Sequence, residues 1–175
     1  MKKLLLILLF FPRLILGQQT YVPDDNFEAY LEANGMGDGI ANNDSVTKDN
    51  IRGVITLDVS YLKNIADLTG IEDFTALTYL NCRSNQLTNL DVSQNTALTS
   101  LLFSNNQIIN LDVSQNTILT DLFCFNNKLT SLDVSQNTAL ISLYCYNNQL
   151  TSLDLSQNTA LKNLDCYNNQ LTNLD

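Results

Sequence analysis

Cysteine recurs at one fixed place in a repeated pattern, L-x-x-L-x-C, so thiol chemistry is the first to consider. In an extended segment whose alternate side chains face inward, this place points to the core. We predict buried free thiols that pack as small apolar groups, because neighbouring parallel segments present their sulfurs poorly for a disulfide. The absence of a C-x-x-C pair argues against a cysteine zinc site. The cysteines are Cys82, Cys124, Cys145 and Cys166, and Phe103 fills the same place in the intervening unit.

A second row consists of aspartates within L-D-V-S or L-D-L-S, each between two apolar residues expected to face inward. The carboxylates should point outward at a spacing of roughly 5 Å, with a serine beside each. Close like charges should raise their pKa values. Calcium could bridge the row, but protein calcium sites normally converge six or more oxygens, so we favour a solvated acidic face and expect no metal or cofactor. The row is Asp91, Asp112, Asp133 and Asp154.

Aromatic residues gather at positions that vary between units. The outward positions of the first half of each unit are Asn81/Arg83, Leu102/Ser104, Phe123/Phe125, Tyr144/Tyr146 and Asp165/Tyr167. Contiguous exposed aromatic surface usually marks a recognition patch, and tyrosine is favoured at interfaces. Simple cross-strand packing of β-favouring residues is the alternative. The predicted partner-binding residues are Phe123, Phe125, Tyr144, Tyr146 and Tyr167.

Catalytic constellations are missing from the sequence. The chain contains no histidine, which removes the usual neutral-pH base and the commonest metal ligand. Nothing resembles a nucleophile–base pair or a glycine-rich phosphate loop, and the carboxylates stand in rows rather than in a cleft. We therefore predict that the protein is not an enzyme.

These side chains are positioned by a repeat of 21 residues. Full units begin at Leu77, Leu98, Leu119 and Leu140, and a fifth begins at Leu161. Within each unit the spacing L-x-x-L-x-L predicts a turn feeding a short strand. The seven or so apolar side chains of one unit contribute on the order of 10 kcal/mol, less than ordering the unit costs, so the units must stack.

Asparagines close both halves of each unit. Inward-facing asparagine at a corner can bond backbone groups of its own and adjacent coils, so both rows are predicted to be structural. The first row is Asn85, Asn106, Asn127, Asn148 and Asn169, and the second is Asn95, Asn116, Asn137 and Asn158.

The units resemble bacterial leucine-rich repeats, whose consensus is L-x-x-L-x-L-x-x-N. The 21-residue variety nests this half-pattern twice, as from Leu140 to Asn158, and the 22-residue unit Ile55–Ala76 resembles the internalin-like type. The resemblance implies a mainly β solenoid of stacked 21–22-residue coils over residues 55–175, with a small helical N-terminal cap. It further implies secreted or surface-attached proteins that bind other macromolecules.

Residues 18–54 do not repeat and are predicted to form this helical N-terminal cap. Asp25 followed by Glu28 predicts a capping box at a helix start, and Gly35 is placed to end that helix. A second short helix is expected from about Ser45 to Ile51. The stretch from Asp38 to Asp44 is read as a turn rather than as a calcium loop, because the acidic spacing is wrong.

Residues 1–17 are predicted to be a signal peptide. Lys2 and Lys3 precede the apolar stretch Leu4–Phe11, and Gly17 offers a cleavage point. Removing these residues would leave six Lys and Arg against 18 Asp and Glu, a net charge of about −12. A protein this acidic is repelled by nucleic acid and anionic membranes, and the stretch is too short to span a membrane. We expect a secreted or cell-surface protein.

The sequence thus predicts an exported leucine-rich-repeat module that binds a protein partner through the aromatic residues. The alternatives are a glycan or cell-wall binding module and a structural spacer of a longer surface protein. The chain ends at Asp175 in the middle of a unit, so we expect a fragment of a longer protein. Otherwise the open last coil, with Leu171 and Leu174, should favour end-to-end self-association.

Overall fold

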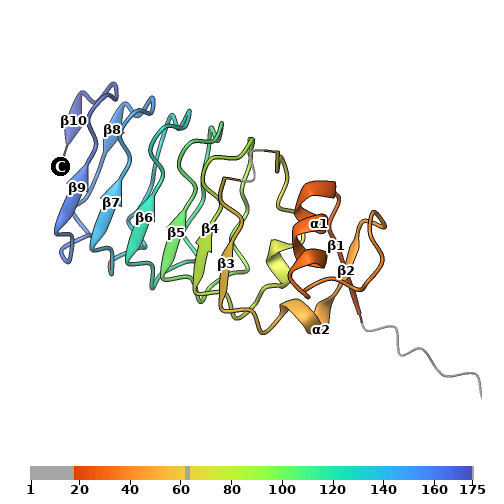
Figure 1. Ribbon diagram of the computed structural model, residues 1–175. Helices are drawn as coiled ribbons and strands as arrows, with labels where there is room; N and C mark the ends of the chain where they lie inside the picture. Colours follow the sequence, from red (N-terminus) through yellow and green to blue (C-terminus); the bar gives the residue numbers. More distant parts are fainter. Residues whose placement is uncertain (1–17, 62–63, 175) are drawn as a thin grey trace, which may run out of the picture.

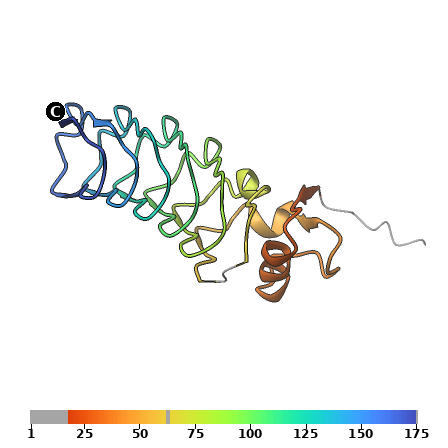
Figure 2. The ribbon, with the colours of Figure 1, turned by 90° about the horizontal axis from the view of Figure 1, so that it is seen from above.

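Stacked coils form an elongated solenoid with a small helical unit at one end (Figure 1, Figure 2). This computed structural model describes residues 18–61 and 64–174. The segment predicted to be a signal peptide, residues 1–17, lies outside the described residues. The predicted mainly β solenoid is confirmed.

One strand from each coil enters a parallel sheet in the order β3-β4-β5-β6-β7-β9. Ser100 lies opposite Tyr79, and Asp121 lies opposite Ser100, so paired residues are one repeat apart. The sheet therefore places equivalent side chains of successive units side by side. Its strands are β3 (Thr56–Asp58), β4 (Tyr79–Asn81), β5 (Ser100–Leu102), β6 (Asp121–Phe123), β7 (Ser142–Tyr144) and β9 (Asn163–Asp165).

The second half of each coil forms less strand than its spacing predicts. Only β8 (Ser152–Leu153) and β10 (Asn173–Leu174) form there among the described residues, as a parallel pair. In these halves the aspartate accepts a hydrogen bond from the serine N–H two residues on, as Asp91 does from Ser93 at 2.9 Å. This turn bends the backbone and leaves a short extended segment before each aspartate. The strand predicted there is therefore wrong for the coils that begin at Leu77, Leu98 and Leu119.

The core is a set of apolar columns shared between coils. The leucines that begin the units, Leu77, Leu98, Leu119 and Leu140, are fully buried. Burying one such side chain contributes about 1.5–3 kcal/mol. Because each leucine is covered partly by the coils before and after its own, the burial depends on stacking.

Both inward asparagine rows bond the backbone as predicted. Asn127 donates to the carbonyls of Phe103 and Cys124 at 3.2 and 3.1 Å, and its Oδ1 accepts from the N–H of Ile108 at 3.1 Å. In the second row, Asn116 donates to the carbonyls of Val92 and Asn95. These amides therefore join consecutive coils from inside.

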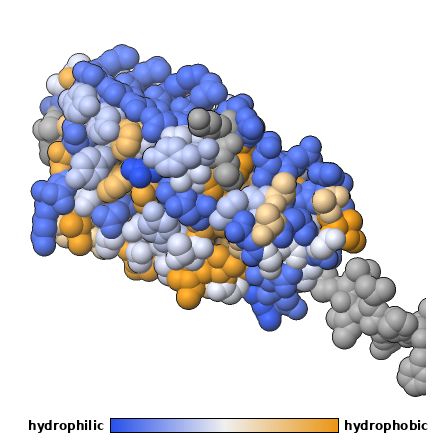
Figure 3. Space-filling view, viewed as in Figure 1, coloured by the Kyte–Doolittle hydropathy of each residue, from blue (hydrophilic) through white to orange (hydrophobic). Residues whose placement is uncertain are grey.

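A third asparagine row, which the sequence analysis did not identify, follows the outside of the same corner. Its members adopt left-handed φ values of 50–58°, a conformation that asparagine tolerates better than most residues. Each Nδ2 donates to Oδ1 of the preceding member, over 2.6–2.8 Å. A hydrophilic band follows this upper edge of the coils in Figure 3. The row is Asn105, Asn126, Asn147 and Asn168.

The N-terminal unit packs two short strands and two helices against the first coil (Figure 1). Strands β1 (Gln19–Tyr21) and β2 (Ser45–Thr47) pair antiparallel. Helix α1 (Asp25–Ala33) buries Phe27 against Phe74, with ring centroids 6.4 Å apart. The second helix of this unit is α2 (Lys48–Ile51), and the first coil contains the 3₁₀ turn η1 (Ile71–Asp73).

Asp24, rather than Asp25, caps helix α1. Its Oδ1 accepts from the N–H groups of Asn26 and Phe27, each at 3.0 Å. The predicted capping box is wrong by one residue, and Glu28 instead accepts from the backbone of Asn43 and Asp44. The second carboxylate oxygen of Asp24 accepts from two N–H groups of the first coil, Ala66 at 2.7 Å and Asp67 at 3.1 Å. One side chain thus fastens the helix to the solenoid.

The end of α1 and the segment after it match the predictions in part. Gly35 has a φ of 72°, and the N–H of Met36 bonds the carbonyl of Leu31, which is the Schellman arrangement expected of a glycine stop. The helix predicted from Ser45 to Ile51 begins only at Lys48, because Ser45–Thr47 pairs with β1.

Candidate functional site

The outer side of the parallel sheet presents columns of side chains that run along the solenoid, and two of these columns form the candidate site. Alternate residues of each strand face outward, and the alternation continues two residues beyond each strand. The first column contains Asp58, Asn81, Leu102, Phe123, Tyr144 and Asp165, and the second contains Arg83, Ser104, Phe125, Tyr146 and Tyr167.

The five predicted aromatic residues lie together on β6, β7, β9 and the residues after them. We call them the aromatic face. Phe123 meets Tyr144 edge-on at 4.7 Å between ring centroids. Phe125 stacks on Tyr146 at 4.5 Å, and Tyr146 stacks on Tyr167 at 4.7 Å. These separations equal the spacing between strands, so the sheet itself sets the stacking distance.

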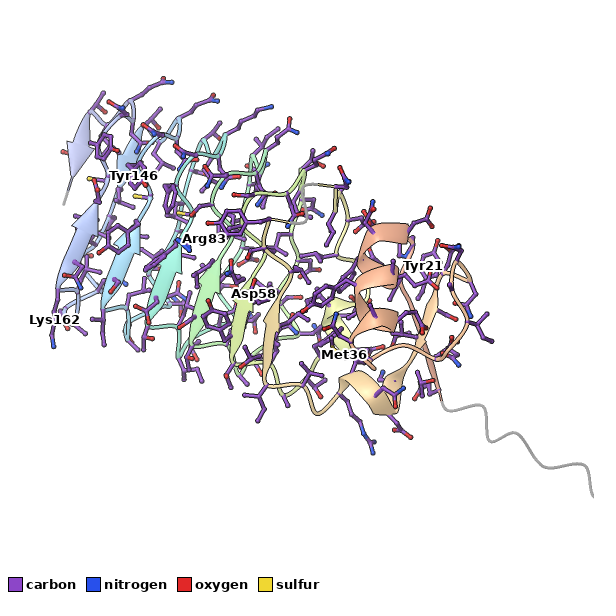
Figure 4. All side chains as sticks on the ribbon, in the orientation of Figure 1. Tyr21, Met36, Asp58, Arg83, Tyr146 and Lys162 are labelled. Atoms are coloured by element: carbon purple, nitrogen blue, oxygen red, sulfur yellow. The ribbon has the colours of Figure 1, made fainter. Side chains whose placement is uncertain are left out.

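Arg83 joins the aromatic face from two strands away. Its guanidinium carbon lies 5.6 Å from the Phe123 ring centroid and 5.7 Å from that of Phe125, within the range of cation–π attraction. Between them on β5 and just after it, Leu102 is 7% exposed and Ser104 is 0% exposed, although both occupy outward positions. The arginine side chain therefore extends over this coil. In Figure 4, Arg83 lies between Asp58 and Tyr146 along the solenoid.

An open cleft of about 350 Å³ lies among these side chains. It is lined by all five residues of the aromatic face together with Arg83 and Asp165. The sequence analysis placed Arg83 and Asp165 at outward positions but did not include them in the site. Ser104 lies between Arg83 and Phe125 in the same column, and its small side chain leaves room for the arginine to reach the ring. This is the feature of the sequence that could have indicated the contact between Arg83 and Phe125.

Both charged residues of the cleft act on Tyr146. Burial raises the pKa of this phenol, and the neighbouring Tyr167 and Asp165 raise it further. The positive charge of Arg83 lowers the same pKa. Tyr146 therefore stays protonated at neutral pH and can donate a hydrogen bond from its hydroxyl.

The aspartate row does not behave as the sequence predicts. The pKa values of Asp112, Asp133 and Asp154 are lowered, mainly by the hydrogen bond that each accepts from the backbone N–H of the serine two residues on. Repulsion from Asp112 and Asp154 raises the pKa of Asp133, but less strongly. The predicted raising of these pKa values is therefore wrong, because a local hydrogen bond outweighs the repulsion between like charges on adjacent exposed coils.

The described residues place three potential metal-ligating side chains together in the cap rather than in the aspartate row. Asp25, Glu28 and Asp44 have carboxylate oxygens within 4.8 Å of one another. Glu28 is buried, and its oxygens accept backbone hydrogen bonds from Asn43 and Asp44. These bonds give the buried carboxylate a structural role in the loop between α1 and β2.

The four cysteines are free thiols, as predicted. Cys82, Cys124 and Cys145 are buried and Cys166 is half-buried. Burial raises the pKa of Cys82 and of Cys145 to about 12. Such thiols are protonated and unreactive at neutral pH. The fully buried Phe103 lies in the same inward position of the coil between Cys82 and Cys124.

Comparisons with known proteins identify the repeats. Residues 138–175 match the family described as Leucine Rich repeats (2 copies). The chain is 44% identical to Internalin J of Listeria monocytogenes serotype 4b (strain F2365) over 75 residues, which are 43% of the chain and 8% of that protein. The functional domain of internalin J, which includes a cysteine ladder, has a similar structure with a TM-score of 0.80 and 43% identity. That match covers 91% of this chain and 36% of the domain.

Two more distant solved structures share the fold. A leucine-rich-repeat protein of Leptospira interrogans matches with a TM-score of 0.65 and 22% identity, over 74% of this chain and 39% of that protein. An internalin from Listeria monocytogenes matches with a TM-score of 0.57 and 23% identity, over 87% of this chain and 58% of that protein.

The stacked coils and their inward leucine and asparagine columns define a leucine-rich-repeat solenoid. The chain is similar in sequence and fold to bacterial leucine-rich-repeat proteins of the internalin type, and it spans about a third of the internalin J domain that it matches. Among residues 18–61 and 64–174, none of the helices has the length and apolar character needed to cross a membrane.

Proposed function

We propose that this chain is an exported recognition module that binds a protein partner through the aromatic face. The observation that carries the proposal is the cluster of five rings around an open cleft on three consecutive coils. Rings held in contact lose little conformational freedom on binding, and tyrosine adds a hydroxyl to its apolar area. The similarity to internalin J supports a role in recognition.

Ring geometry favours a protein over a glycan as the partner. Sugars stack on open ring faces, whereas Phe125, Tyr146 and Tyr167 are nearly parallel, with interplanar angles of 8° and 6°, and cover one another. The Arg83 guanidinium lies over the other end of this stack, against Phe125. The cleft therefore presents mainly ring edges and hydroxyl groups, which suit the mixed polar and apolar surface of a protein.

If the chain were only a structural spacer, the outward residues of these two columns would not need to change from coil to coil. The inward residues of successive coils are nearly constant, whereas the outward ones change from Asn81 and Arg83 to Tyr144 and Tyr146 within three coils. A surface that only separates two other parts of a protein has no need for a contiguous aromatic cluster.

Export is the second part of the proposal, and it rests on the sequence of residues 1–17. Expressing the full chain in a secreting bacterium and sequencing the N-terminus of the secreted protein tests it. We expect the mature chain to begin at Gln18. Retention in the cytoplasm with Met1 intact would contradict export without affecting the recognition site.

The recognition role is tested with Tyr144→Ala/Tyr146→Ala. A protein captured by the native chain is identified, purified and titrated against each variant, and the same variants are tested on an array of purified glycans. We expect the double substitution to raise the Kd for the protein at least about tenfold, the effect of losing a hot spot. Ile109→Ala/Ile118→Ala removes exposed apolar area elsewhere on the coils and is the matched control.

Three results would overturn the proposal. The double tyrosine variant could bind the purified protein as the native chain does. Glycans alone could bind, with loss in the tyrosine variant, which would assign the face to sugars. If neither a protein nor a glycan binds, the chain would instead be interpreted as a structural spacer. Equal thermal unfolding of native chain and variants must accompany each measurement, so that a loss of binding is not a loss of folding.

A further inference from the structure

The cleft beside the aromatic face has opposite charges at its two ends. Arg83 follows β4 and is the basic residue of the two columns that form the site, and its guanidinium lies against Phe123 and Phe125. Asp165 lies on β9, two strands beyond β6. Phe123, Phe125 and the tyrosines lie between them and line the same cleft.

Both charges are available to a partner. Within the described residues, no hydrogen bond or ion pair engages the Arg83 guanidinium, although two rings hold it in place and its charge also lowers the pKa of Asp58. Its N–H donors are therefore oriented but unsatisfied, which suits recognition of a carboxylate. The carboxylate of Asp165 likewise has no hydrogen-bond partner in this part of the chain.

The other acidic residues of the sheet differ from Asp165 in this respect. Asp58 accepts from the side chain of Asn81 and from the N–H of Ser60. Asp121 accepts from the hydroxyls of Thr120 and Ser100. Asp165 is therefore the outward carboxylate whose bonding capacity is directed to the cleft.

The distance between the two charges suggests how a partner would lie. The distance from the Arg83 guanidinium to the Asp165 carboxylate is roughly 14 Å, because β9 lies two strand spacings from β6 and the guanidinium lies about one further spacing away, toward β5. Four residues of an extended chain span about the same distance, and residues i, i+2 and i+4 of such a chain point to one side. An extended segment along the solenoid could thus reach both charges and the rings between them.

We propose that the cleft binds an extended segment of a partner protein that carries an acidic residue and a basic residue four positions apart, with an apolar residue midway. The acidic side chain pairs with Arg83, the basic one with Asp165, and the apolar one packs on the rings. This inference rests on the proposed function, because it names the partner chemistry of the same face. The opposing effects of Arg83 and Asp165 on the pKa of Tyr146 support its position between the two charges.

Four synthetic peptides test the inference, and they differ only at the outer positions of X-Thr-Leu-Thr-Z. The pairs X and Z are Glu and Lys, Lys and Lys, Glu and Glu, and Gln and Gln, each with blocked termini. Titration of isotope-labelled protein, followed by NMR up to millimolar peptide, detects weak binding. We expect the Glu/Lys peptide to bind about fivefold more tightly than the Gln/Gln peptide, as two partly exposed charge pairs allow.

Charge reversal makes the test specific. With Arg83→Glu the Lys/Lys peptide should become the tightest ligand, and with Asp165→Lys the Glu/Glu peptide should. Arg52→Glu and Asp49→Lys make the same changes in the cap, on residues that pair with each other at the surface, and should preserve the native order of affinities.

The outcomes separate the two proposals. If the native chain binds the Lys/Lys peptide most tightly, the result shows only that a chain of net charge −9 attracts cations, and it overturns the inference. Equal binding of all four peptides, lost in Tyr146→Ala, would also overturn it while leaving the aromatic face as a binding site. Absence of binding for every peptide overturns the inference, and capture of a purified partner then decides the proposed function by itself.

Discussion

Replacing Asn127 by leucine removes a buried amide that bonds three backbone groups within 3.2 Å, besides a longer contact of 3.5 Å to the carbonyl of Phe125. The carbonyls of Phe103 and Cys124 keep a second donor, since Asn106 bonds the first and Asn148 bonds the second. Among the described residues, the N–H of Ile108 donates only to the Oδ1 of Asn127. The substitution therefore leaves the buried N–H of Ile108 without an acceptor, and the carbonyls of Phe103 and Cys124 each lose one of their hydrogen bonds.

The magnitude follows from these three losses. An unsatisfied buried N–H costs about 1–3 kcal/mol, and each further bond contributes about 0.5–1.5 kcal/mol net. The added leucine offsets part of the loss, because burying its side chain contributes about 1.5–3 kcal/mol. We expect the free energy of unfolding to fall by about 2 kcal/mol, the middle of the range that these terms give.

Asn85→Leu is the matched control. Asn85 donates to the carbonyls of Val59 and Cys82, but its Oδ1 accepts from no group among the described residues. Asn85→Leu therefore orphans no N–H and should destabilise the chain by about 1–3 kcal/mol less than Asn127→Leu.

Urea unfolding followed by circular dichroism and by tyrosine fluorescence measures both losses, and agreement of the two signals checks that unfolding is cooperative. Amide hydrogen exchange should show selective deprotection of Ile108 in Asn127→Leu. Equal destabilisation by the two substitutions, or an unchanged exchange rate at Ile108, would refute the reasoning that the row acts by satisfying backbone N–H groups.

Three further predictions concern the cap, the aspartate row and the thiols. Asp24→Ala removes a helix cap and two bonds to the first coil, so unfolding should require about 2–3 kcal/mol less, whereas Asp25→Ala should change stability by less than about 1 kcal/mol in the same urea titration. Because the pKa of Asp133 is lowered in the folded state, its contribution to stability is present above the unfolded pKa of about 3.9 and is lost as the pH falls through the folded value. Asp133→Asn should therefore flatten the acid limb of the stability curve, and an unchanged limb would contradict the hydrogen-bond explanation. Iodoacetamide at mildly alkaline pH should label Cys166 first and leave Cys82 and Cys145 protected, while all four thiols should titrate after denaturation.

Features with a fixed period were predictable from the sequence. A strand turns alternate side chains to opposite sides, so the position of Cys124 predicts an inward thiol and the positions of Phe123 and Phe125 predict an outward pair. The inward bonding of Asn127 follows in the same way, because a polar side chain at a buried corner needs backbone partners. Stacking one repeat on the next then brings the aromatic residues together.

Features that depend on contacts across the repeat were not predictable. Arg83 reaches Phe123 and Phe125 because the residues between them are small or short, which is a relation among three coils rather than a pattern within one. Asp24 accepts from the N–H groups of Ala66 and Asp67 across the junction between the cap and the first coil, and no local signal in the sequence marks this contact. The pKa of Asp133 depends on whether a backbone N–H or a neighbouring charge acts more strongly, and only the geometry decides between them.

The outer asparagine row has a consequence for the gene. Asn126 bonds Asn105, and Asn147 bonds Asn126, always between residues 21 apart, as the paired residues of strands β4 to β9 also are. Duplication or loss of 21 codons would therefore preserve these contacts, whereas an insertion of any other length within the array would interrupt them. Loss of the unit from Leu98 to Ile118 would leave the scaffold intact and place Arg83 directly beside Phe125. Unequal recombination could thus give a lineage a different binding surface in one step, without new core residues.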